Sequence, residues 1–422
     1  MFAVGARMPS RKGGFFGWRV LAAAFMLAVC GWGLGFYGPP IYLHAVQAAR
    51  GWSLSLVSVA VTTHFLAGAA TVANLPALYH RFGLALVTKI GGLLLAGGVL
   101  GWAVATAPWQ LFVATLASGA GWAAAGAAAI NAIVAPWFVR TRPAALAMAY
   151  NGASIGGVVF SPLWVAAIGL LGFSVAATVI GAAVALTIWV LADLLFSRTP
   201  QQMGLAPDGD APGAPAIPLA APTAKPLPDA QLWRDRKFLT LAAGMALGLF
   251  AQIGLIAHLF SLLVPALGVQ QAGLAMGGAT AAAIAGRTLV GWSMPAGADR
   301  RLIACASYAV QIVGSLAFIA AGGANVPLLL VGVLLFGVGI GNATSLPPLI
   351  AQVEFVADDI SRVVSLIVAV AQGAYAFAPA AFGVIRELAP AGADSGAATP
   401  FFAAAALVQV LAIGVFLAGR GR

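Results

Sequence analysis

Acidic residues are scarce in this chain and unevenly placed. The 422 residues include only 11 aspartates and glutamates, and none of them precedes Asp193. No carboxylate can therefore lie deep within the first five apolar segments. A membrane protein that exports cationic drugs in exchange for protons needs a buried acid to attract the cation and carry the proton. The sequence argues against that class of protein.

Charge of either sign is also scarce, and so is cysteine. Charged residues make up 8% of the chain and hydrophobic residues 62%, whereas a typical soluble domain is roughly 25% charged. Such a chain cannot bury its apolar surface in water. Its two cysteines, Cys30 and Cys305, lie in separate apolar runs. We interpret both as small apolar filler and expect neither a disulfide nor a metal site.

Long apolar runs predict an all-α membrane protein with twelve spanning helices. A helix needs about 20 mostly apolar residues to cross a hydrocarbon core of about 30 Å. The runs cover residues 16–38, 54–77, 87–106, 109–135, 144–171, 172–196, 238–264, 271–294, 302–322, 326–351, 362–386 and 399–419. The first run is long enough to span and lacks a small-residue cleavage site, so we expect a permanent helix and no cleaved signal peptide.

Lysine and arginine are distributed asymmetrically between the two ends of the spans. If the N-terminus is cytoplasmic, nearly all basic residues fall on the cytoplasmic side and only Arg50 and Arg386 fall outside. The positive-inside rule therefore places both termini in the cytoplasm. The formal net charge of +10 follows from this bias. Nucleic-acid binding is not indicated, because the sequence has no basic stripe on a water-exposed fold.

Residues 197–236 interrupt the apolar pattern. This stretch is rich in proline and alanine and has no apolar period, which is typical of a flexible linker. It divides the chain into an N-terminal six-helix bundle (1–196), a cytoplasmic linker (197–236) and a C-terminal six-helix bundle (237–422). An interaction motif within the linker is the alternative interpretation.

The two halves repeat each other at an offset near 219 residues. PALYHRFG (76–83) corresponds to PAGADRRL (295–302), SGAGW to FGVGI, and YNGAS (150–154) to AQGAY (371–375). Each match is weak alone in a chain so rich in glycine and alanine. Their common offset and order indicate two related halves.

Twelve spans, a central linker, parallel halves and basic loops after the second and eighth spans resemble the major facilitator superfamily over nearly the whole chain. The loop signature of that superfamily, Gly-x-x-x-Asp-Arg-x-Gly, is degenerate here. Pro76 and His80 replace its glycine and aspartate in the first half, whereas Asp299 and Arg300 are kept in the second. The segments GFFGWRV, YGPPIYL and RTPQQMGLAPDG are similar to bacterial members of the oxalate/formate and monocarboxylate porter branch.

This resemblance implies a transporter of the bacterial inner membrane. Its two bundles enclose a central cavity that opens alternately to each side of the bilayer. We expect a monomer that binds a small-molecule anionic substrate, with protons as candidate co-substrates, and that needs no cofactor.

Arg287, in AIAGRTLVGW, is the one charge that the sequence places clearly within a span. Intramembrane charges are costly and usually face a cavity. The repeat counterpart of Arg287 is Gly68, so the repeat does not require the charge. In the resembled transporters an arginine in this helix binds the substrate carboxylate, which a guanidinium can hold through two hydrogen bonds. The alternative is that Arg287 extends toward the cytoplasm and pins the nearby loop.

The sequence departs from the resembled transporters at other positions. Monocarboxylate porters carry an aspartate one turn before that arginine, where this chain has Ala283, and a lysine in the first helix, which has no match here. The oxalate exchanger has a second cation in the eleventh helix, where Gln372 stands. We therefore expect a substrate with one anionic group, and proton coupling of the familiar kind is not indicated.

Uncharged polar residues within the spans complete the predicted pocket. Several in the eleventh span share one helical face. The candidate substrate-binding residues are Arg287, Gln372, Tyr375, Tyr37, Asn131, Tyr150, Asn151 and Asn342. A hydrogen bond that bridges two helices is an equally good interpretation for each uncharged member.

Histidine is the only side chain whose ordinary pKa lies near neutrality. In the absence of a central acid, His64 and His258 are the candidate proton carriers, and a neutral hydrogen-bonding role is the alternative for both. At the cytoplasmic face, ion pairs formed in only one conformation would bias the balance between two states. The candidate gating residues are Arg81, Asp299, Arg300, Glu354 and Arg362.

These features favour a secondary active or facilitative transporter of a small organic anion, in the first place a monocarboxylate. Efflux of a hydrophobic or toxic compound is the alternative, favoured by tryptophans in the spans and disfavoured by the missing acid. A receptor built on this scaffold needs an appended signalling domain. An enzyme needs a nucleophile with its base or a metal cluster, and the sequence indicates neither.

Overall fold

The computed structural model describes residues 14–210, 229–295, 297–388 and 398–420, and all regular structure in these ranges is helical. The helices of the first half are α1 (Phe16–Gly35), α2 (Pro39–Arg50), α3 (Leu54–Phe82), α4 (Leu84–Val104), α5 (Pro108–Ala123), α6 (Ala127–Val134), α7 (Arg142–Leu171) and α8 (Phe173–Leu191). Those of the second half are α10 (Arg236–Leu267), α11 (Val269–Ser293), α12 (Arg300–Ala321), α13 (Val326–Glu354), α14 (Ala357–Tyr375), α15 (Ala378–Glu387) and α16 (Thr399–Ala418). A π-helical turn (Ala192–Phe196) extends α8, and the short helix α9 (Asp229–Leu232) precedes α10.

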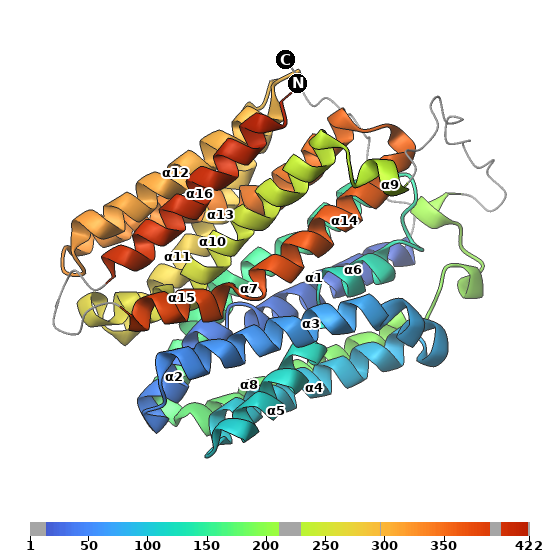
Figure 1. Ribbon diagram of the computed structural model, residues 1–422. Helices are drawn as coiled ribbons and strands as arrows, with labels where there is room; N and C mark the ends of the chain where they lie inside the picture. The colour runs from blue at the N-terminus through green and yellow to red at the C-terminus, as the bar shows by residue number, and fades with distance from the viewer. Residues whose placement is uncertain (1–13, 211–228, 296, 389–397, 421–422) are drawn as a thin grey trace.

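The helices form two bundles, the blue-to-green first half and the yellow-to-red second half (Figure 1). Three spans are broken into two helices each: α1 with α2, α5 with α6, and α14 with α15. Counted this way, each bundle has six spans, and the predicted fold class is confirmed. Helices α4, α5 and α7 begin at residues 84, 108 and 142, and α12, α13 and α14 at 300, 326 and 357. These starts agree with the predicted repeat.

Eleven helical segments in the described part of the chain are long and apolar enough to cross a membrane. The remaining span is α11, which has 25 residues but is less apolar because it contains Gln270, Gln271 and Arg287 among several glycines. It packs against α7 of the first bundle and α13 of its own. The least apolar span therefore lies where the two bundles meet.

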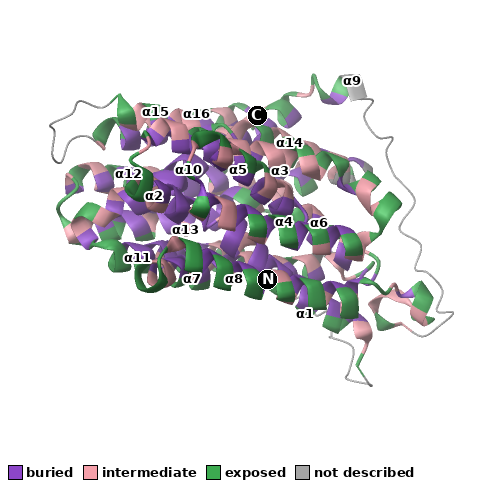
Figure 2. Cartoon of the chain, turned by 90° about the horizontal axis from the view of Figure 1, so that it is seen from below, coloured by how far each residue is buried: buried purple, intermediate pink, exposed green. Residues whose placement is uncertain are grey.

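The surface of the helices is largely apolar. Leu170, Leu186 and Trp292 are 83%, 65% and 85% exposed, and Figure 2 shows exposed residues on the outer helices around a buried interior. Exposed apolar surface of this extent marks contact with lipid, and continuous helices satisfy their own backbone hydrogen bonds there.

The break between α1 and α2 follows from two prolines. Pro39 and Pro40 lack the backbone N–H groups that would continue the helical hydrogen bonds to Gly35 and Phe36. The carbonyl of Gly35 is thereby freed to accept a hydrogen bond from the His64 ring at 2.8 Å. The apolar run predicted to end at residue 38 continues as α2 to Arg50.

The two bundles meet at one end of the molecule. We call the face where α1 begins and α16 ends the terminal face, and the other the opposite face. Helices α7 with α11, α3 with α15 and α2 with α10 form the main contacts between bundles. The Ser55 N–H donates to Glu387 Oε1 at 3.1 Å, and the Ala380 N–H donates to Thr62 Oγ1 at 3.1 Å. All these groups lie in the helix halves nearer the opposite face, which is closed.

The linker departs from the expectation of a flexible segment over its first part. Asp208 accepts hydrogen bonds from the backbone N–H groups of Val139, Arg140 and Thr141, and from the Thr141 hydroxyl at 2.6 Å. Arg140 pairs with Asp210 at 3.0 Å. The loop before α7 offers three successive unpaired donors, and one carboxylate satisfies them all. Residues 211–228 of the predicted linker lie outside the described residues.

Candidate functional site

The contact between α7 and α11 sets the position of Arg287. A Cβ added at Gly157 of α7 would lie 2.6 Å from Thr280 Cγ2 and 2.7 Å from the Tyr37 ring, so only glycine allows this approach. Gly273 and Gly277 of α11 meet α7 in the same way. Arg287 follows Thr280 by seven residues, about two helical turns, and so shares its face. The guanidinium lies on the side of α11 that meets the first bundle.

The Arg287 side chain is half-buried and only partly satisfied. Its Nε donates to the carbonyl of Gly341 in α13 at 3.2 Å. The two Nη groups have no hydrogen-bond partner among the described residues and are not sealed from solvent. No carboxylate in the described ranges forms an ion pair with this arginine. A planar fork of N–H donors is thus left open beside the junction of the two bundles.

Tyr37 of the first bundle lies within electrostatic reach of Arg287. It stands in the break between α1 and α2, where its ring contacts Phe36 at 5.0 Å. Phe65 of α3 lies between Phe36, at 6.1 Å, and Tyr375 of α14, at 5.9 Å. Two predicted residues, Tyr37 and Tyr375, are thereby brought to one aromatic cluster that joins the bundles, and Arg287 lies beside it.

His64 holds the break that carries Tyr37. Its Nε2 bonds the carbonyl of Gly35, and its Nδ1 bonds the hydroxyl of Ser118 at 2.8 Å. Because a carbonyl only accepts, Nε2 carries the proton, and in the neutral ring Nδ1 accepts from Ser118. Trp102 donates to the same hydroxyl at 3.2 Å. The ring is buried and stacks on Trp122, so both nitrogens have structural partners.

His258 also bonds the backbone at a helix break, in the second bundle. Its Nε2 donates to the carbonyl of Pro379, just after the break between α14 and α15, at 3.0 Å. The ring is fully buried, and Phe401 packs edge-on against it at 5.6 Å. Its Nδ1 has no partner among the described residues. Each predicted histidine therefore bonds backbone at a helix break, which matches the hydrogen-bonding alternative.

The remaining predicted pocket residues are spread over several environments. Asn131 and Asn151 are exposed and make no side-chain hydrogen bond within the described residues, and Gln372 is half-buried with none. Tyr150 donates to the Ala127 carbonyl at 3.1 Å, which bridges α7 and α6. Asn342 is buried and bonds only Val338 of its own helix, at 3.4 Å. Only the two exposed asparagines remain fully open to a ligand.

The predicted gating residues of the second bundle form contacts at the terminal face. Asp299 accepts from the backbone N–H groups of Arg301 and Leu302, which caps α12, and from Arg420 Nε at 2.7 Å. Partial burial by itself raises the pKa of Asp299, but the hydrogen bonds from Leu302 and Arg420 hold that pKa below its ordinary value. Arg300 donates to the carbonyl of Leu349.

Glu354 pairs with Arg301 through two hydrogen bonds, of 2.6 and 2.8 Å. Arg362 lies 3.6 Å from Asp359, one turn earlier in α14, and the side chain of Asp358 lies outside the described residues. Arg81 is exposed and stands 5.1 Å over the Phe82 ring. The ion pairs described here for these predicted residues all lie within the second bundle.

The sequence did not predict that two further cations, Arg301 and Arg386, are removed from solvent within the bundles, although Arg301 was expected to pair with the loop that contains Glu354. Arg301 is 1% exposed, and besides Glu354 it donates to Thr240 and to the carbonyls of Lys237 and Phe416. Arg386, predicted to lie on the external side at the end of the span 362–386, is half-buried and donates to Ser261 at 2.6 Å. Arg287 is thus not the only charge within the helical bundles. Glu354, at the end of the tenth span, was the one sequence feature that could have indicated a partner for Arg301. No sequence feature indicated a partner for Arg386.

Comparison with known proteins gives consistent results. Residues 20–379 match the family described as the Major Facilitator Superfamily. A bacterial homologue of the human lysosomal transporter Spinster, inward-facing and occupied, has a TM-score of 0.72 and 13% identity over 97% of each chain. The nucleoside transporter NupG has a TM-score of 0.69 and 15% identity over 96% of this chain and 99% of that chain. At such identities the likeness shows the fold alone. No curated protein matches the sequence.

Proposed function

The chain belongs to the Major Facilitator Superfamily, and from that premise we propose that this multi-pass transporter carries a small organic anion, in the first place a monocarboxylate. The observation that supports the proposal is the open fork of Arg287. Its Nη groups are unpartnered among the described residues, half-buried, and placed where the bundles meet. A guanidinium removed from bulk water is costly without a counter-ion. The substrate carboxylate supplies that counter-ion.

Chemistry around Arg287 favours one anionic group with an apolar body. The fork binds one carboxylate through two charge-assisted hydrogen bonds, and Tyr37 adds a neutral hydroxyl from the other bundle. The aromatic cluster of Phe36, Phe65 and Tyr375 beside it suits an apolar substituent. Arg301, one of the two other cations within the bundles, has its own carboxylate in Glu354 and is not available to a second anionic group.

We place the terminal face in the cytoplasm of a bacterial inner membrane. Exposed arginines at that face include Arg81, Arg140 and Arg198, whereas Arg50 is exposed at the opposite face, as the positive-inside rule requires. The contacts between the bundles then close the external side. The chain would be in the inward-facing state, the conformation named for the similar Spinster homologues.

The register of α7 against α11 indicates a further substrate-contacting residue from the first bundle. Val158 and Pro162 of α7 pack on Gly277. Asn151 lies on the same face of α7, about two turns before Val158 and about three before Pro162, and therefore nearer the terminal face. It is exposed because the two helices have separated there. If the contact extends to the terminal face as the transporter closes, Asn151 comes opposite Arg287. We assign its amide to the substrate pocket of the closed state.

Uptake of labelled monocarboxylates into proteoliposomes tests the proposal. A hydrogen bond to a charged group contributes about 1.5–3 kcal/mol, and 1.4 kcal/mol is tenfold. Arg287→Gln is therefore expected to lower uptake about tenfold or more, and Arg287→Lys, which keeps the charge but loses the fork, by less. Arg50→Gln, an exposed arginine at the opposite face, is the control and should transport as the native protein does.

Two results would overturn the proposal. One is that no carboxylate or related organic anion is taken up by the native protein. The other is that Arg287→Gln transports such anions normally. Transport of neutral hydrophobic compounds, unaffected by Arg287→Gln, would instead support the efflux alternative, for which the same aromatic cluster would form the binding surface.

A further inference from the structure

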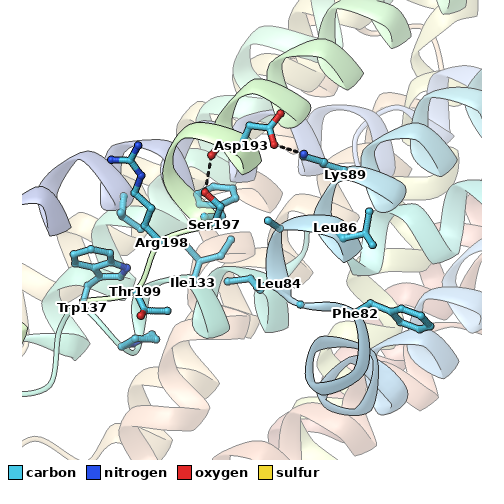
Figure 3. Close-up of a pocket in the computed structure, with 15 residues that line it drawn as sticks. Phe82, Leu84, Leu86, Lys89, Ile133, Trp137, Asp193, Ser197, Arg198 and Thr199 are labelled. Atoms are coloured by element: carbon cyan, nitrogen blue, oxygen red, sulfur yellow. Dashed lines mark hydrogen bonds and ion pairs between the residues drawn. The ribbon is translucent and has the colours of Figure 1, made fainter. Parts of the chain in front are cut away.

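A second site lies within the first bundle, away from the junction with the second. A cavity of about 490 Å³ opens at the terminal face between α1, the start of α4, the end of α6 and the turn after α8. Figure 3 shows Lys89 and Asp193 on one side of it, with Trp137 and Arg198 on the other. No helix of the second bundle lines it. Its function is therefore separate from substrate binding at Arg287.

The lining of this cavity carries more positive than negative charge. Lys89 forms an ion pair with Asp193 and lies 4.8 Å over the Trp189 ring. Arg198 is exposed at the rim, 5.8 Å over Phe16, and has no carboxylate partner in the described ranges. One acid thus faces two cations. The hydroxyls of Ser197 and Thr199 also line the cavity.

Backbone donors add to this positive lining. The first turn of α4 lines the cavity from Gly83 to Leu86, and no side chain caps this helix. Its first N–H groups are therefore free to donate to an anion. They strengthen the field of Lys89 and Arg198.

The rim of the cavity is apolar where it meets the surface that we assign to lipid. Phe82 and Leu86 line the cavity and are 48% and 45% exposed. Leu194, on the π-helical turn beside Asp193, is 59% exposed. A lining that is mostly apolar but carries a net positive cluster of Lys89, Asp193 and Arg198, with an apolar exit, fits a molecule that has an anionic head and an apolar tail. A free anion would gain nothing from that exit.

We propose that this cavity binds the phosphate headgroup of an anionic phospholipid from the cytoplasmic leaflet. Lys89 and Arg198 contact the phosphate, the hydroxyls of Ser197 and Thr199 accept or donate hydrogen bonds at its edge, and the acyl chains leave over Phe82 and Leu86. Basic pockets between helices on the cytoplasmic side are suited to such headgroups. The site rests on the cytoplasmic placement of the terminal face and not on the substrate of transport.

Binding of this lipid would join elements that are distant in the sequence. The cavity lies between the start of α4 and the π-helical turn Ala192–Phe196, which is held to α4 by the pair of Lys89 with Asp193. A ligand that binds only the folded protein stabilises it. The lipid would therefore raise the temperature of unfolding.

Delipidated full-length protein in a neutral detergent provides the test. Thermal unfolding is followed with added phosphatidylglycerol, phosphatidylcholine or inorganic phosphate, and native mass spectrometry counts the bound lipid. We expect phosphatidylglycerol to raise the unfolding temperature. We also expect the protein to retain one more molecule of phosphatidylglycerol than of phosphatidylcholine. Arg198→Gln should lose more than half of that shift, and Lys89→Gln with Arg198→Gln nearly all of it.

Arg50→Gln removes an exposed arginine at the opposite face and should keep the full shift. Lys89→Gln also breaks the ion pair with Asp193 and leaves that carboxylate unpaired. The double variant Lys89→Gln with Asp193→Asn removes both charges, so its count of bound lipid is measured under conditions in which it is as fully folded as the native protein. An unchanged shift and lipid count in Arg198→Gln would overturn the proposal. So would equal effects of the two lipids, or an effect of inorganic phosphate that phosphatidylglycerol does not reproduce. Carboxylate uptake by these variants reports on the proposed function independently.

Discussion

At the scale of single residues, His64 shows how a helix break is stabilised. The carbonyl of Gly35 is free because Pro39 has no N–H, and the His64 ring supplies the missing donor. On its other side the ring orders the hydroxyl of Ser118, which also accepts from Trp102. The buried His64 ring is therefore held in place by hydrogen bonds on both of its nitrogens.

Replacing His64 tests this role. His64→Leu keeps the volume but leaves the Gly35 carbonyl without its donor, while the Ser118 hydroxyl keeps its bonds with Trp102 and the Thr115 carbonyl. Leaving a buried polar group unsatisfied costs about 1–3 kcal/mol, so the unfolding temperature of the purified protein should fall by several degrees. His80→Leu changes an exposed histidine and should have little effect. Equal unfolding temperatures for the native protein and His64→Leu would show that the break does not depend on this bond.

The sequence predicted some of the site residues and missed others for a physical reason. Arg287 was identifiable because its neighbours on both sides are apolar for a full span. Arg301 and Arg386 stand near helix ends, where sequence alone cannot distinguish an exposed side chain from a buried one. Packing of α12 against α16 buries Arg301 with Glu354, and packing of α15 against α10 covers Arg386. Such burial depends on contacts between distant segments.

At the scale of elements, helix positions followed closely from the apolar pattern, because a run of about 20 apolar residues has few other structures open to it in a bilayer. The breaks were harder to predict. Pro39 and Pro40 interrupt the backbone bonds of the first span, yet Pro76 lies inside α3 without ending it. At the break after α1, the carbonyl of Gly35 accepts from His64 of another helix, a contact that the local sequence does not indicate.

The first part of the linker, which follows α8, adopts a defined structure that its composition did not predict. Asp208 adopts a left-handed backbone conformation, with φ of 59°, so that its carboxylate reaches three N–H groups in the loop before α7. This contact ties the beginning of the linker to the end of α7 at the terminal face. Helix α7 forms the largest contact between the two bundles, with α11. Anchoring α7 to the linker therefore helps to fix the position of the first bundle against the second.

Asp208→Asn should weaken this anchor, because an amide oxygen is a poorer acceptor and its NH₂ group faces backbone donors. We expect a loss of about 1 kcal/mol, since the site is partly exposed to solvent. Asp210→Asn, which removes only the exposed pair with Arg140, is the control and should cost less. Limited proteolysis of the linker and thermal unfolding measure the change, and equal behaviour of the two variants would contradict the assigned role.

The pH dependence of this anchor follows from the same bonds. Partial burial raises the pKa of Asp208, but the hydroxyl of Thr141 and the N–H groups of Arg140, Thr141 and Val139 more than offset it, so the pKa lies below its ordinary value. A lowered pKa in the folded state means that the stabilisation is present above the ordinary value and is lost as pH falls through the folded one. Native protein and Asp208→Asn should therefore converge in stability at acidic pH.

At the scale of the whole molecule, transport requires two states of similar energy, so a small change at the junction shifts the balance between them. Gly157 permits a close approach of the bundles, against Thr280 of α11, and also lies against the Tyr37 ring of its own bundle. The methyl group of Gly157→Ala would overlap both, and overpacking of this kind costs about 1–3 kcal/mol. Because the opposite face is closed where this contact forms, we expect the cost to fall on the state that is closed at that face.

Gly157→Ala should therefore favour the state that is open at the opposite face. A cysteine introduced in place of Ser58, which packs against Gly383 between α3 and α15, reports the change through its rate of labelling by a membrane-impermeant maleimide in cells. The rate is expected to rise several-fold in Gly157→Ala, because a shift of 1.4 kcal/mol changes the ratio of states tenfold. Gly278→Ala, where an added Cβ meets nothing within 4 Å, is the matched control. Equal labelling in both variants would mean that the contact of α7 with α11 does not set the balance, and that the seal between α3 and α15 opens independently of it.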